Sequence, residues 1–295
     1  MAKRILILGV TGMLGHTLFR QLGASGRYAV SGTARSLHGL EHCIQNADAK
    51  IMQGIDAESY DSLARAIAEA QPDVVVNCIG IIKQLPIAND PLTAITINAQ
   101  FPHRIALLCK AAGARMIHFS TDCVFSGEKG NYTESDQSDA TDLYGRSKFL
   151  GEVEYDHCVT LRSSIIGHEL KGRYGLVEWF LSQEWRINGY TNAIYTGFPT
   201  IEMSRIIGQY VIPTPDLSGL YHVSSPPISK FDLLGIIAER YGKTTKIVPF
   251  DGFRCDRSLN SERFRKATGY EPPNWTELIA VMHRDFKSQS FYRRN

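Results

Sequence analysis

The segment "GVTGMLG", residues 9–15, constrains the fold of this chain more than any other, because glycine recurs at every third position directly after an apolar run. The preceding residues, "RILIL" at 4–8, are typical of a strand buried on both faces. Gly9, Gly12 and Gly15 permit a tight turn and let backbone N–H groups at the start of a helix approach a phosphate. They therefore predict a dinucleotide-binding turn, with a ligand-free glycine turn as the alternative.

Strands and helices alternate through the first half of the 295 residues. Apolar and β-branched runs predict strands, and apolar residues at helical spacing predict helices between them. The expected strands cover residues 4–10, 28–35, 50–54, 73–80, 114–122 and 157–167, and the expected helices cover residues 11–25, 60–71, 91–113 (with a bend near Pro102) and 143–156. Such alternation implies a Rossmann-type, doubly wound parallel sheet of the α/β class, with helices on both faces.

The pattern changes after about residue 167, where shorter elements carry many aromatic residues and loop signals. This half is expected to form a smaller α+β lobe that binds the substrate. The predicted division is residues 1–166 for the nucleotide-binding domain and 167–295 for the substrate lobe, with the option that some later chain returns to the sheet. Because no flexible linker separates the halves, we expect them to pack against each other.

Composition excludes several classes of function. The formal net charge is +2 and no long basic run occurs, so neither nucleic acid nor a membrane is an expected partner. The six cysteines form no pair or cluster with zinc spacing, so no metal site is expected. The first residues, "MAKRILILGV", do not resemble a signal peptide, and no apolar stretch reaches the length of a membrane span. The simplest expected location is the cytoplasm.

The end of the second expected strand indicates which nicotinamide cofactor is bound. An acidic residue here would bind the ribose 2′-hydroxyl of NADH, but the segment "SGTARS" contains none. Arg35 and Ser36 lie about twenty residues past the glycine turn, where the specificity residue is expected. A guanidinium and a hydroxyl suit a 2′-phosphate, which favours NADPH over NADH. The alternative is that Arg35 is an ordinary exposed arginine.

The third expected strand is followed by "GIDAE". Ile55 and Asp56 are candidates to border the adenine of the cofactor. An N-cap of the next helix is an equally good interpretation of Asp56, and the sequence leaves both open.

The segments "HFSTDCVFSG" and "YGRSK" carry the groups that suit carbonyl reduction. Thr121 lies at the carboxyl end of an expected strand, where open α/β sheets place ligands. Tyr144 and Lys148 lie one turn apart on one face of the following helix. A phenol can protonate a carbonyl oxygen as hydride arrives, an ammonium beside it is expected to lower the phenol pKa, and the Thr121 hydroxyl polarises the carbonyl.

In this order, the glycine turn, "NCIG", "STDCVFSG", "YGRSK" and "LRSSIIG" resemble the extended short-chain dehydrogenase/reductases, and among them the dTDP-4-dehydrorhamnose reductase family. The similarity extends to "GLYHVSS" and "ATGYEPPNW" near the end of the chain. The resemblance implies an active site of Thr121, Tyr144 and Lys148. It also matches Asn98 to an asparagine that often holds a water near the lysine; a polar residue bending a helix is the alternative.

The same resemblance implies the other contacts and partners. Members of the family bind a nucleotide-sugar and are often monomers or weak homodimers. By analogy with their loop positions, the cofactor is expected to contact Gly9, Thr11, Gly12, Met13, Leu14, Asn77, Cys78, Ile79 and Gly80, together with Tyr144 and Lys148.

Two departures from the family lie where the hexose is expected. Cys123 stands where the usual "STDYVF" pattern of the family has a tyrosine. The segment "IIKQLPIAND" stands where the family usually has an Ala-rich stretch that contains an Asp-Lys pair. Lys83 in that loop is a candidate for a sugar or phosphate contact, or a solvated lysine. These differences favour a related nucleotide-sugar, with a UDP-2-acetamido-2,6-dideoxy-hexos-4-ulose as one candidate. Some relatives in cell-surface polysaccharide pathways resemble the chain in these loops.

The substrate is expected to lie between this edge of the sheet and the second lobe. Thr121, Asp122 and Cys123 are its expected neighbours on the sheet side, and Arg254 and Arg257 are candidates for its pyrophosphate. Aromatic residues are candidates to stack on a base or sugar, or are core residues: Trp179, Trp185, Tyr190, Tyr195 and Phe198.

The function that these features favour is NADPH-dependent reduction of the 4-keto group of a nucleotide-activated 6-deoxy-hexos-4-ulose. One alternative is an epimerase or dehydratase with tightly bound NAD, although dehydratases have a Thr-Asp-Glu sequence and Cys123 stands where the glutamate would be. The other is a non-catalytic NADP-binding regulatory subunit, a class that often loses part of the Thr, Tyr and Lys set.

Overall fold

The computed structural model describes residues 2–44 and 49–292. Its main feature is a seven-stranded sheet with the order β10-β6-β5-β4-β1-β2-β3, in which all paired strands are parallel. The strands are β1 (Lys3–Leu8), β2 (Tyr28–Thr33), β3 (Lys50–Met52), β4 (Val74–Asn77), β5 (Arg115–Thr121), β6 (Cys158–Ser163) and β10 (Gly219–His222). The order reverses direction at β1, as in a doubly wound sheet, so the predicted fold class is confirmed.

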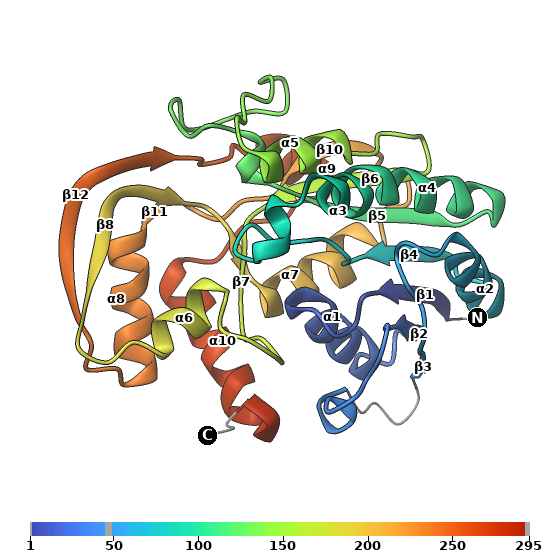
Figure 1. The fold of residues 1–295 in the computed structure, drawn as a ribbon, viewed down its shortest axis with the longest axis horizontal. Coiled ribbons are helices and arrows are strands. Elements are labelled where there is room, and N and C mark those ends of the chain that lie inside the picture. The colour runs from blue at the N-terminus through green and yellow to red at the C-terminus, as the bar shows by residue number, and fades with distance from the viewer. Residues whose placement is uncertain (1, 45–48, 293–295) are drawn as a thin grey trace.

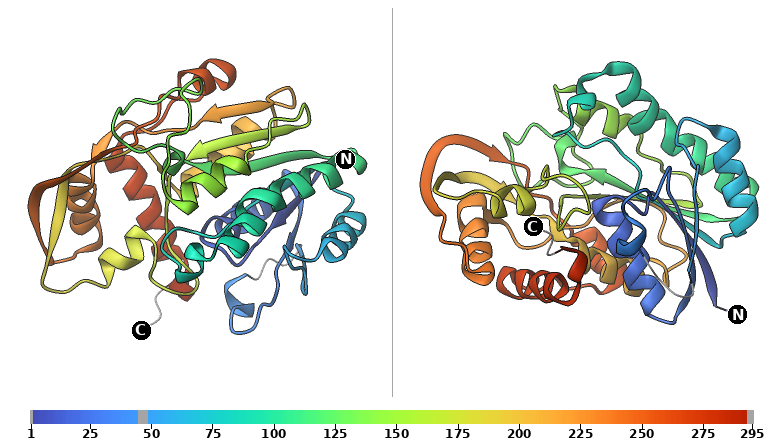
Figure 2. Two further views of the ribbon diagram at one scale, coloured as in Figure 1. Left: turned by 45° about the horizontal axis from the view of Figure 1, so that its top comes forward. Right: turned by 60° about the horizontal axis from the view of Figure 1, so that its bottom comes forward.

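Helices cover both faces of this sheet (Figures 1 and 2). The strand β1 shows why both faces need cover: Ile5 and Ile7 belong to one hydrophobic core, and Leu6 and Leu8 belong to the other. The helices α1 (Met13–Ala24) and α7 (Thr200–Ile206) contribute to the first core, and α2 (Tyr60–Ala70) and α4 (Phe101–Ala111) contribute to the second. All four side chains in β1 have no exposed surface, as the continuous apolar run predicts.

The long helical segment predicted at residues 91–113 is interrupted. It consists of α3 (Pro91–Ala94), a π-helical stretch (Ile95–Gln100) and α4. Pro102 lies in the first turn of α4, where a missing N–H costs little, so the chain changes its helical geometry just before the proline. Asn98 lies within the π-helical stretch.

The helix predicted at residues 143–156 is shorter than expected. It is α5 (Leu143–Leu150), and Gly151 ends it. A Cβ on Gly151 would lie 1.9 Å from the carbonyl oxygen of Asn98, so this position packs directly on the backbone of the π-helical stretch. The residues after it leave the helix, and Glu152 turns toward β6. The prediction for residues 151–156 was therefore wrong, because tertiary contact ended the helix early.

The second lobe contains a three-stranded sheet in the order β11-β8-β12, on the left of Figure 1. Its strands are β8 (Arg186–Tyr195), β11 (Ile228–Ser229) and β12 (Lys246–Asp256), and a separate pair is formed by β7 (Ile165–Ile166) and β9 (Phe198–Pro199). The accompanying helices are α6 (Leu176–Leu181), α8 (Lys230–Tyr241), α9 (Glu262–Thr268) and α10 (Trp275–Ser288). This mixture is the α+β organisation expected for the later chain.

Part of the later chain lies with the large sheet. After β9, α7 packs against α1, and β10 then extends the sheet beside β6. Helix α10 contacts both α7 and α8, so it connects the layer beneath the large sheet with the second lobe. Residues 200–222 thus belong spatially to the first half, while the division at residue 166 stays a prediction.

A buried ion pair lies at the carboxyl end of β6. Glu152 accepts hydrogen bonds from Arg162 Nε and Nη2, both at 2.7 Å, and from the Ser120 hydroxyl at 2.6 Å. The side chains of Arg162 and Glu152 are only 3% and 4% exposed. Arg162 Nη1 also donates to Nε2 of His222 on β10, at 3.3 Å. These contacts join three neighbouring strands and the residues that follow α5.

Replacing Glu152 with Ala should destabilise the protein strongly, because it leaves the Arg162 guanidinium buried without its counter-ion. We expect the free energy of unfolding to fall by about 3–5 kcal/mol in urea titrations. Glu262→Ala removes a carboxylate from an exposed pair with Lys266 and should change the urea midpoint little. Equal midpoints for the two variants would contradict this account of the ion pair.

Candidate active site

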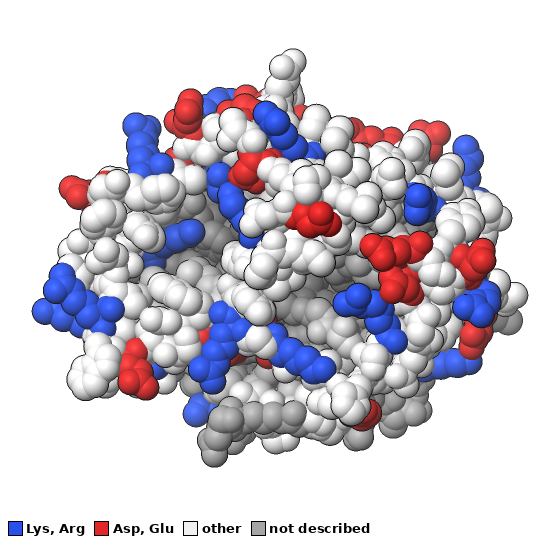
Figure 3. Space-filling view, viewed as in Figure 1, with Lys and Arg blue, Asp and Glu red and all other residues white. Residues whose placement is uncertain are grey.

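A pocket lies between the carboxyl ends of the central strands and the second lobe. Its walls come from the start of α1, the loop after β4, the end of β5, the helix α5, and residues of β7, α6, β8, α8 and β12. In Figure 3 the surface is hollowed near the centre of the face shown, and Lys and Arg side chains gather around the hollow. This is the edge at which parallel α/β sheets place ligands.

The glycine turn forms one end of the pocket. Gly9 has φ +84°, and a Cβ on Gly15 would lie 2.1 Å from the carbonyl oxygen of Gly9, so helix α1 approaches the turn more closely than any side chain allows. Gly12 is the N-cap of α1 and supplies no side-chain cap. Gly12, Met13 and Leu14 line the pocket, whereas Gly9, Thr11 and Gly15 are not among its lining residues.

This end of the pocket fits a pyrophosphate. The first N–H groups of a helix have no partner within it, and the first turn of α1 contains no acidic residue that would oppose an anion. A Cβ on Gly12 would meet only the Gly9 carbonyl oxygen, at 3.5 Å, so space is left beside the turn. The predicted dinucleotide site therefore has both the open backbone and the favourable helix terminus that it requires.

The loop after β4 forms the wall beside the turn. Asn77 Oδ1 accepts a hydrogen bond from the Ile79 N–H at 3.0 Å and thereby holds the loop as it leaves the strand. A Cβ on Gly9 would lie 2.8 Å from Ile79 Cγ1, so the two loops are in contact. Asn77, Cys78, Ile79 and Gly80 all line the pocket, and their contact with the cofactor stays a prediction.

The predicted adenosine end is adjacent to the glycine turn but lies outside the pocket lining. The Gly9 and Val10 N–H groups donate to Thr33 O at the end of β2. Gly54 N donates to Arg35 O at 3.0 Å, which brings the segments after β2 and β3 together. Arg35 and Ser36 are exposed there.

Ile55 and Asp56 follow β3 in the same region. Ile55 is buried, and Asp56 Oδ1 accepts a hydrogen bond from the Glu58 N–H at 3.0 Å. The N-cap of α2 is Ser59, which accepts from Ser62 N, so the alternative interpretation of Asp56 as the helix N-cap was wrong.

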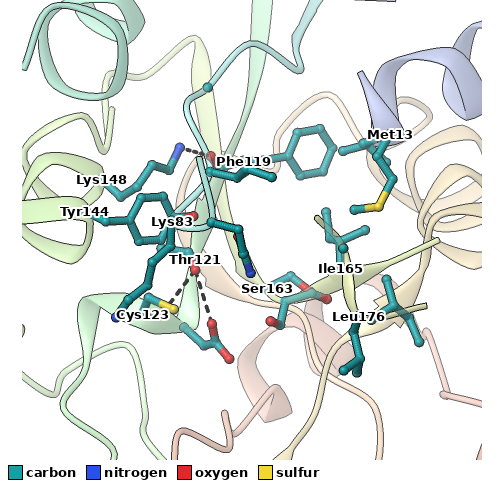
Figure 4. A pocket seen from close by; sticks show the side chains of 18 of the residues that line it. Met13, Lys83, Phe119, Thr121, Cys123, Tyr144, Lys148, Ser163, Ile165 and Leu176 are labelled. Atoms are coloured by element: carbon teal, nitrogen blue, oxygen red, sulfur yellow. Dashed lines mark hydrogen bonds between the residues drawn. The ribbon is translucent and has the colours of Figure 1, made fainter. Parts of the chain in front are cut away.

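Thr121, Tyr144 and Lys148 line one common wall (Figure 4). Asp142 is the N-cap of α5 and accepts from Gly145 N at 2.9 Å, which places Tyr144 in the first turn and Lys148 in the last. Lys148 Nζ donates to the carbonyl oxygen of Phe119 on β5, at 2.8 Å. Thr121 ends β5, beside the phenol of Tyr144.

Burial determines the pKa values of both groups on α5. It lowers the pKa of Lys148 to about 8, although Glu152 acts in the opposite direction. It raises the pKa of Tyr144, as the Cys123 thiol and Asp122 also do, while a hydrogen bond with the Thr121 side chain lowers it. The expected lowering of the Tyr144 pKa by Lys148 is not found, because burial dominates and the ammonium bonds to Phe119 O. The phenol, which is protonated at neutral pH even at its ordinary pKa, therefore holds its proton to a higher pH.

Asn98 lies behind this wall and does not line the pocket. Its Oδ1 accepts from Ile81 N at 2.9 Å, and its Nδ2 donates to Ile81 O at 3.1 Å and to the Ser147 hydroxyl at 3.4 Å. The amide therefore fixes the loop after β4 against α5. A water held beside Lys148 stays a prediction.

The predicted substrate residues separate into two groups. Asp122, Cys123, Lys83 and Arg257 line the pocket. Lys83 Nζ lies 2.8 Å from Asp142 Oδ2, so it also ties the loop after β4 to the start of α5. Arg257 Nε donates to Phe125 O at 2.7 Å, and its Nη1 donates to the Cys123 sulfur at 3.7 Å.

Phe198 and Arg254 lie outside the pocket lining. Phe198 has no exposed surface and packs edge-on against Tyr270, with ring centroids 5.9 Å apart. Arg254 lies on β12, where Phe253 and Cys255 face the pocket. Since alternate strand residues face opposite sides, Arg254 is directed away.

Several lining residues of the second lobe were not among the predicted site residues. Lys230 begins α8, whose N-cap Ser229 accepts from Asp232 N at 3.0 Å; the capping pattern "SKFD" marks this helix start in the sequence. Trp179 and Tyr195, considered as stacking candidates, do line the pocket, and Phe253 joins them. Trp185 and Tyr190 are not among the lining residues.

The described part of the chain contains no group of three or more His, Cys, Asp or Glu residues that could hold a metal ion. Within residues 2–44 and 49–292, every helix is too short or too polar to cross a membrane.

Comparison with known proteins identifies the family. The model of the family described as "RmlD substrate binding domain" matches residues 3–288. The chain belongs to this family. It is similar along most of its length to the spore coat polysaccharide biosynthesis protein SpsK of Bacillus subtilis, with 28% identity over 94% of this chain and 95% of SpsK. The dTDP-4-dehydrorhamnose reductase of Escherichia coli is 25% identical over 92% of this chain and 94% of that protein.

The structural comparison shows that the fold is shared with a solved structure. A crystal structure of dTDP-4-dehydrorhamnose reductase from Bacillus anthracis in complex with NADP has a TM-score of 0.80 at 20% identity, covering 97% of this chain and 100% of that one. At this identity the likeness shows the shared fold. In three further curated relatives the matched region covers only 41%, 42% and 44% of their length.

The lowered pKa of Lys148 predicts how cofactor affinity depends on pH. The ammonium is present below pH 8 and is lost as the pH rises through about 8, so the affinity for NADPH should weaken between pH 7 and pH 9.5. Fluorescence titration of NADPH measures this dependence. Lys148→Met should bind more weakly and with little change over this range, whereas Lys110→Met, which alters an exposed lysine on α4, should retain the wild-type profile. Identical profiles for all three proteins would refute the prediction.

Proposed function

We propose that this protein reduces the 4-keto group of a nucleotide-activated 6-deoxy-hexos-4-ulose with NADPH, in the synthesis of cell-surface polysaccharide precursors. The observation that carries the proposal is that Thr121, Tyr144 and Lys148 share one wall of a pocket whose end is the glycine turn at α1. The family and the printed functions of SpsK and of the Escherichia coli reductase support the substrate class.

The side chains of this wall have distinct tasks in the reduction. NADPH supplies the hydride when it is bound. Tyr144 holds a proton at its phenol oxygen at neutral pH, as an ordinary phenol does, and can donate it to the carbonyl oxygen of the substrate. Lys148 carries positive charge below about pH 8 and stabilises negative charge that develops beside it. Thr121 lies next to the phenol and can orient the same oxygen.

The proposed cofactor is NADPH in preference to NADH. Arg35 and Ser36 are exposed at the end of β2, beside the glycine turn, and no acidic residue occupies the segment "SGTARS". An arginine can bind a phosphate through charge-assisted hydrogen bonds. The complex of the Bacillus anthracis reductase with NADP is consistent with this preference.

The proposed sugar differs from dTDP-4-dehydrorhamnose. Cys123 lines the pocket in place of the tyrosine usual in the family, and Lys83 in the loop after β4 faces the same space. A UDP-2-acetamido-2,6-dideoxy-hexos-4-ulose is the candidate we favour, with Arg257 and Lys230 available to its charged groups. A monomeric or homodimeric state and a cytoplasmic location stay predictions of the sequence.

The test of this function is a screen of NADPH oxidation against dTDP-, UDP- and GDP-linked 4-keto-6-deoxy sugars, with the product examined by NMR. We expect turnover with at least one of them and formation of a 4-hydroxyl group. Tyr144→Phe should lower kcat by roughly 10²–10⁴-fold while leaving NADPH affinity nearly unchanged, because only the proton donor is lost.

Two outcomes of the screen oppose the proposal. Cofactor binding without oxidation of NADPH by any of these sugars would favour a regulatory subunit, and NAD that stays bound through purification would favour an epimerase or dehydratase. Normal turnover by Tyr144→Phe would remove the proposed proton donor.

Arg35→Ala tests the cofactor preference. The variant should raise KM for NADPH roughly tenfold or more, the effect of losing hydrogen bonds to a charged group, and should change KM for NADH little. The measurement is initial rates with both cofactors at saturating sugar. Arg104→Ala, on the exposed surface of α4, is a control that should leave both constants unchanged. An equal rise in KM for NADPH and for NADH in Arg35→Ala would contradict the assignment of Arg35 as the residue that selects NADPH.

A further inference from the structure

Residues 169–175, between β7 and α6, form a segment that contacts the first half of the chain at two separate places. Near its end, a Cβ on Gly175 would lie 3.6 Å from the Met13 sulfur, so the segment passes the start of α1. Nearer its beginning, Lys171 Nζ donates a hydrogen bond to the carbonyl oxygen of His38, at 2.9 Å. This connecting segment therefore extends from the start of α1 to the turn that follows β2.

The connecting segment has a defined shape. Glu169 Oε2 accepts a hydrogen bond from the Gly175 N–H at 2.8 Å, which closes the segment on itself. The Leu170 side chain packs against the hydrophobic core to which α1 contributes. Gly172 turns the chain with φ +86°, a value that favours glycine. These contacts hold Lys171 at an exposed bend between an anchored leucine and a glycine turn.

The turn that Lys171 reaches is the one that carries the residues expected to bind the 2′-phosphate. The Ser36 hydroxyl oxygen accepts a hydrogen bond from the His38 N–H at 3.0 Å, while Lys171 binds the His38 carbonyl oxygen. Ser36 and Lys171 therefore bond to the two backbone polar groups of one residue. Arg35, which precedes Ser36, is exposed at the same turn. The end of β2 thus has an arginine, a hydroxyl and an ammonium that comes from the second half of the chain.

These groups have hydrogen-bond donors left for a ligand. A lysine ammonium has three N–H donors, and the His38 carbonyl oxygen occupies one of those of Lys171. The Ser36 hydroxyl acts as an acceptor toward His38, so its own proton remains available. In the described part of the chain, no ion pair includes Arg35 or Lys171. The turn therefore has two uncompensated positive charges, which suit a phosphate better than a sugar hydroxyl.

We propose that Lys171 binds the 2′-phosphate of NADPH together with Arg35 and Ser36, an inference that rests on the cofactor of the proposed function. The course of the connecting segment agrees with this role. It passes the predicted pyrophosphate end at Gly175 and reaches the predicted adenosine end at Lys171. NADH has a hydroxyl in place of this phosphate and cannot form the same ionic contact. Lys171 is thus a specificity residue supplied by the second half of the chain.

The experiment measures the affinity of the protein for NADP+ and NAD+, which differ only in the 2′-phosphate. Isothermal titration calorimetry is used for NADP+, and displacement of bound NADPH, followed by its fluorescence, for NAD+. Lys171→Met should raise Kd for NADP+ roughly tenfold or more, the effect of losing a hydrogen bond between charged groups, and should change Kd for NAD+ by less than about twofold. Lys171→Arg restores the positive charge and should recover most of the affinity.

The control is Lys246→Met, which alters an exposed lysine on β12 outside the pocket lining and should leave both dissociation constants unchanged. Because Lys171 is also exposed, Lys171→Met should keep its melting temperature within about 2 °C of wild type. Ionic strength gives a second readout. An increase from about 0.05 M to about 0.5 M should weaken NADP+ binding less in Lys171→Met than in wild type, because one screened ionic contact has been removed.

An equal loss of affinity for NADP+ and NAD+ in Lys171→Met would overturn the proposal, because Lys171 would then act on a part that both nucleotides share or only hold the connecting segment in place. An unchanged Kd for NADP+ would overturn it as well. Neither measurement uses a sugar, so the site and the function are judged separately. A protein that shows the NADP+-specific loss but reduces none of the sugars in the screen keeps this site and refutes the proposed reduction.

Discussion

The site depends on the close packing of helix α5 against two backbone segments, the one that follows β5 and the π-helical stretch. A Cβ on Gly145 would lie 2.3 Å from the carbonyl oxygen of Cys123, and a Cβ on Gly151 would lie 1.9 Å from that of Asn98. Both ends of the helix thus contact main chain at distances that only glycine permits. One contact fixes the helix beside the segment that follows β5, and the other fixes it on the π-helical stretch. Tyr144 and Lys148 lie on the helix between these two contacts and line the pocket.

The sequence alone predicts the structure correctly where a local pattern is compatible with one arrangement of the chain. The apolar run of β1 needs two covered faces, and the glycines at 9, 12 and 15 need a turn against a helix, so the sheet and the cofactor end could be predicted. It was insufficient where distant segments decide. Helix α5 ends at Leu150 because Gly151 meets Asn98, and the facing of Arg254 depends on β12, which shifts register against β8 between Phe250 and Arg254. Phe198 lies in the core because β9 pairs with β7.

The electrostatics of the wall show a second limit of sequence reasoning. Spacing places a lysine one turn from a tyrosine, which suggests that the charge lowers the phenol pKa. The depth of burial, which spacing cannot give, acts on both groups and reverses the expected sign at Tyr144. The proton is then held more tightly by the phenol, so its transfer needs a strongly basic acceptor, such as the oxygen of a carbonyl as it is being reduced. Such a phenol protonates that oxygen and leaves weaker bases in the pocket untouched.

The same burial connects the chemistry with the choice of substrate. Asp122 and Cys123 follow directly on Thr121 and line the same pocket, so a sugar bound beside them would lie next to the proposed catalytic wall. On the opposite side the pocket is closed by Lys230, Phe253 and Arg257 from the second lobe. A sugar that fills the space beside Cys123 would exclude water from Asp122, and this further burial would raise the pKa of its carboxyl group. A sugar that fits poorly would leave water beside this carboxyl group and would not change its pKa in this way.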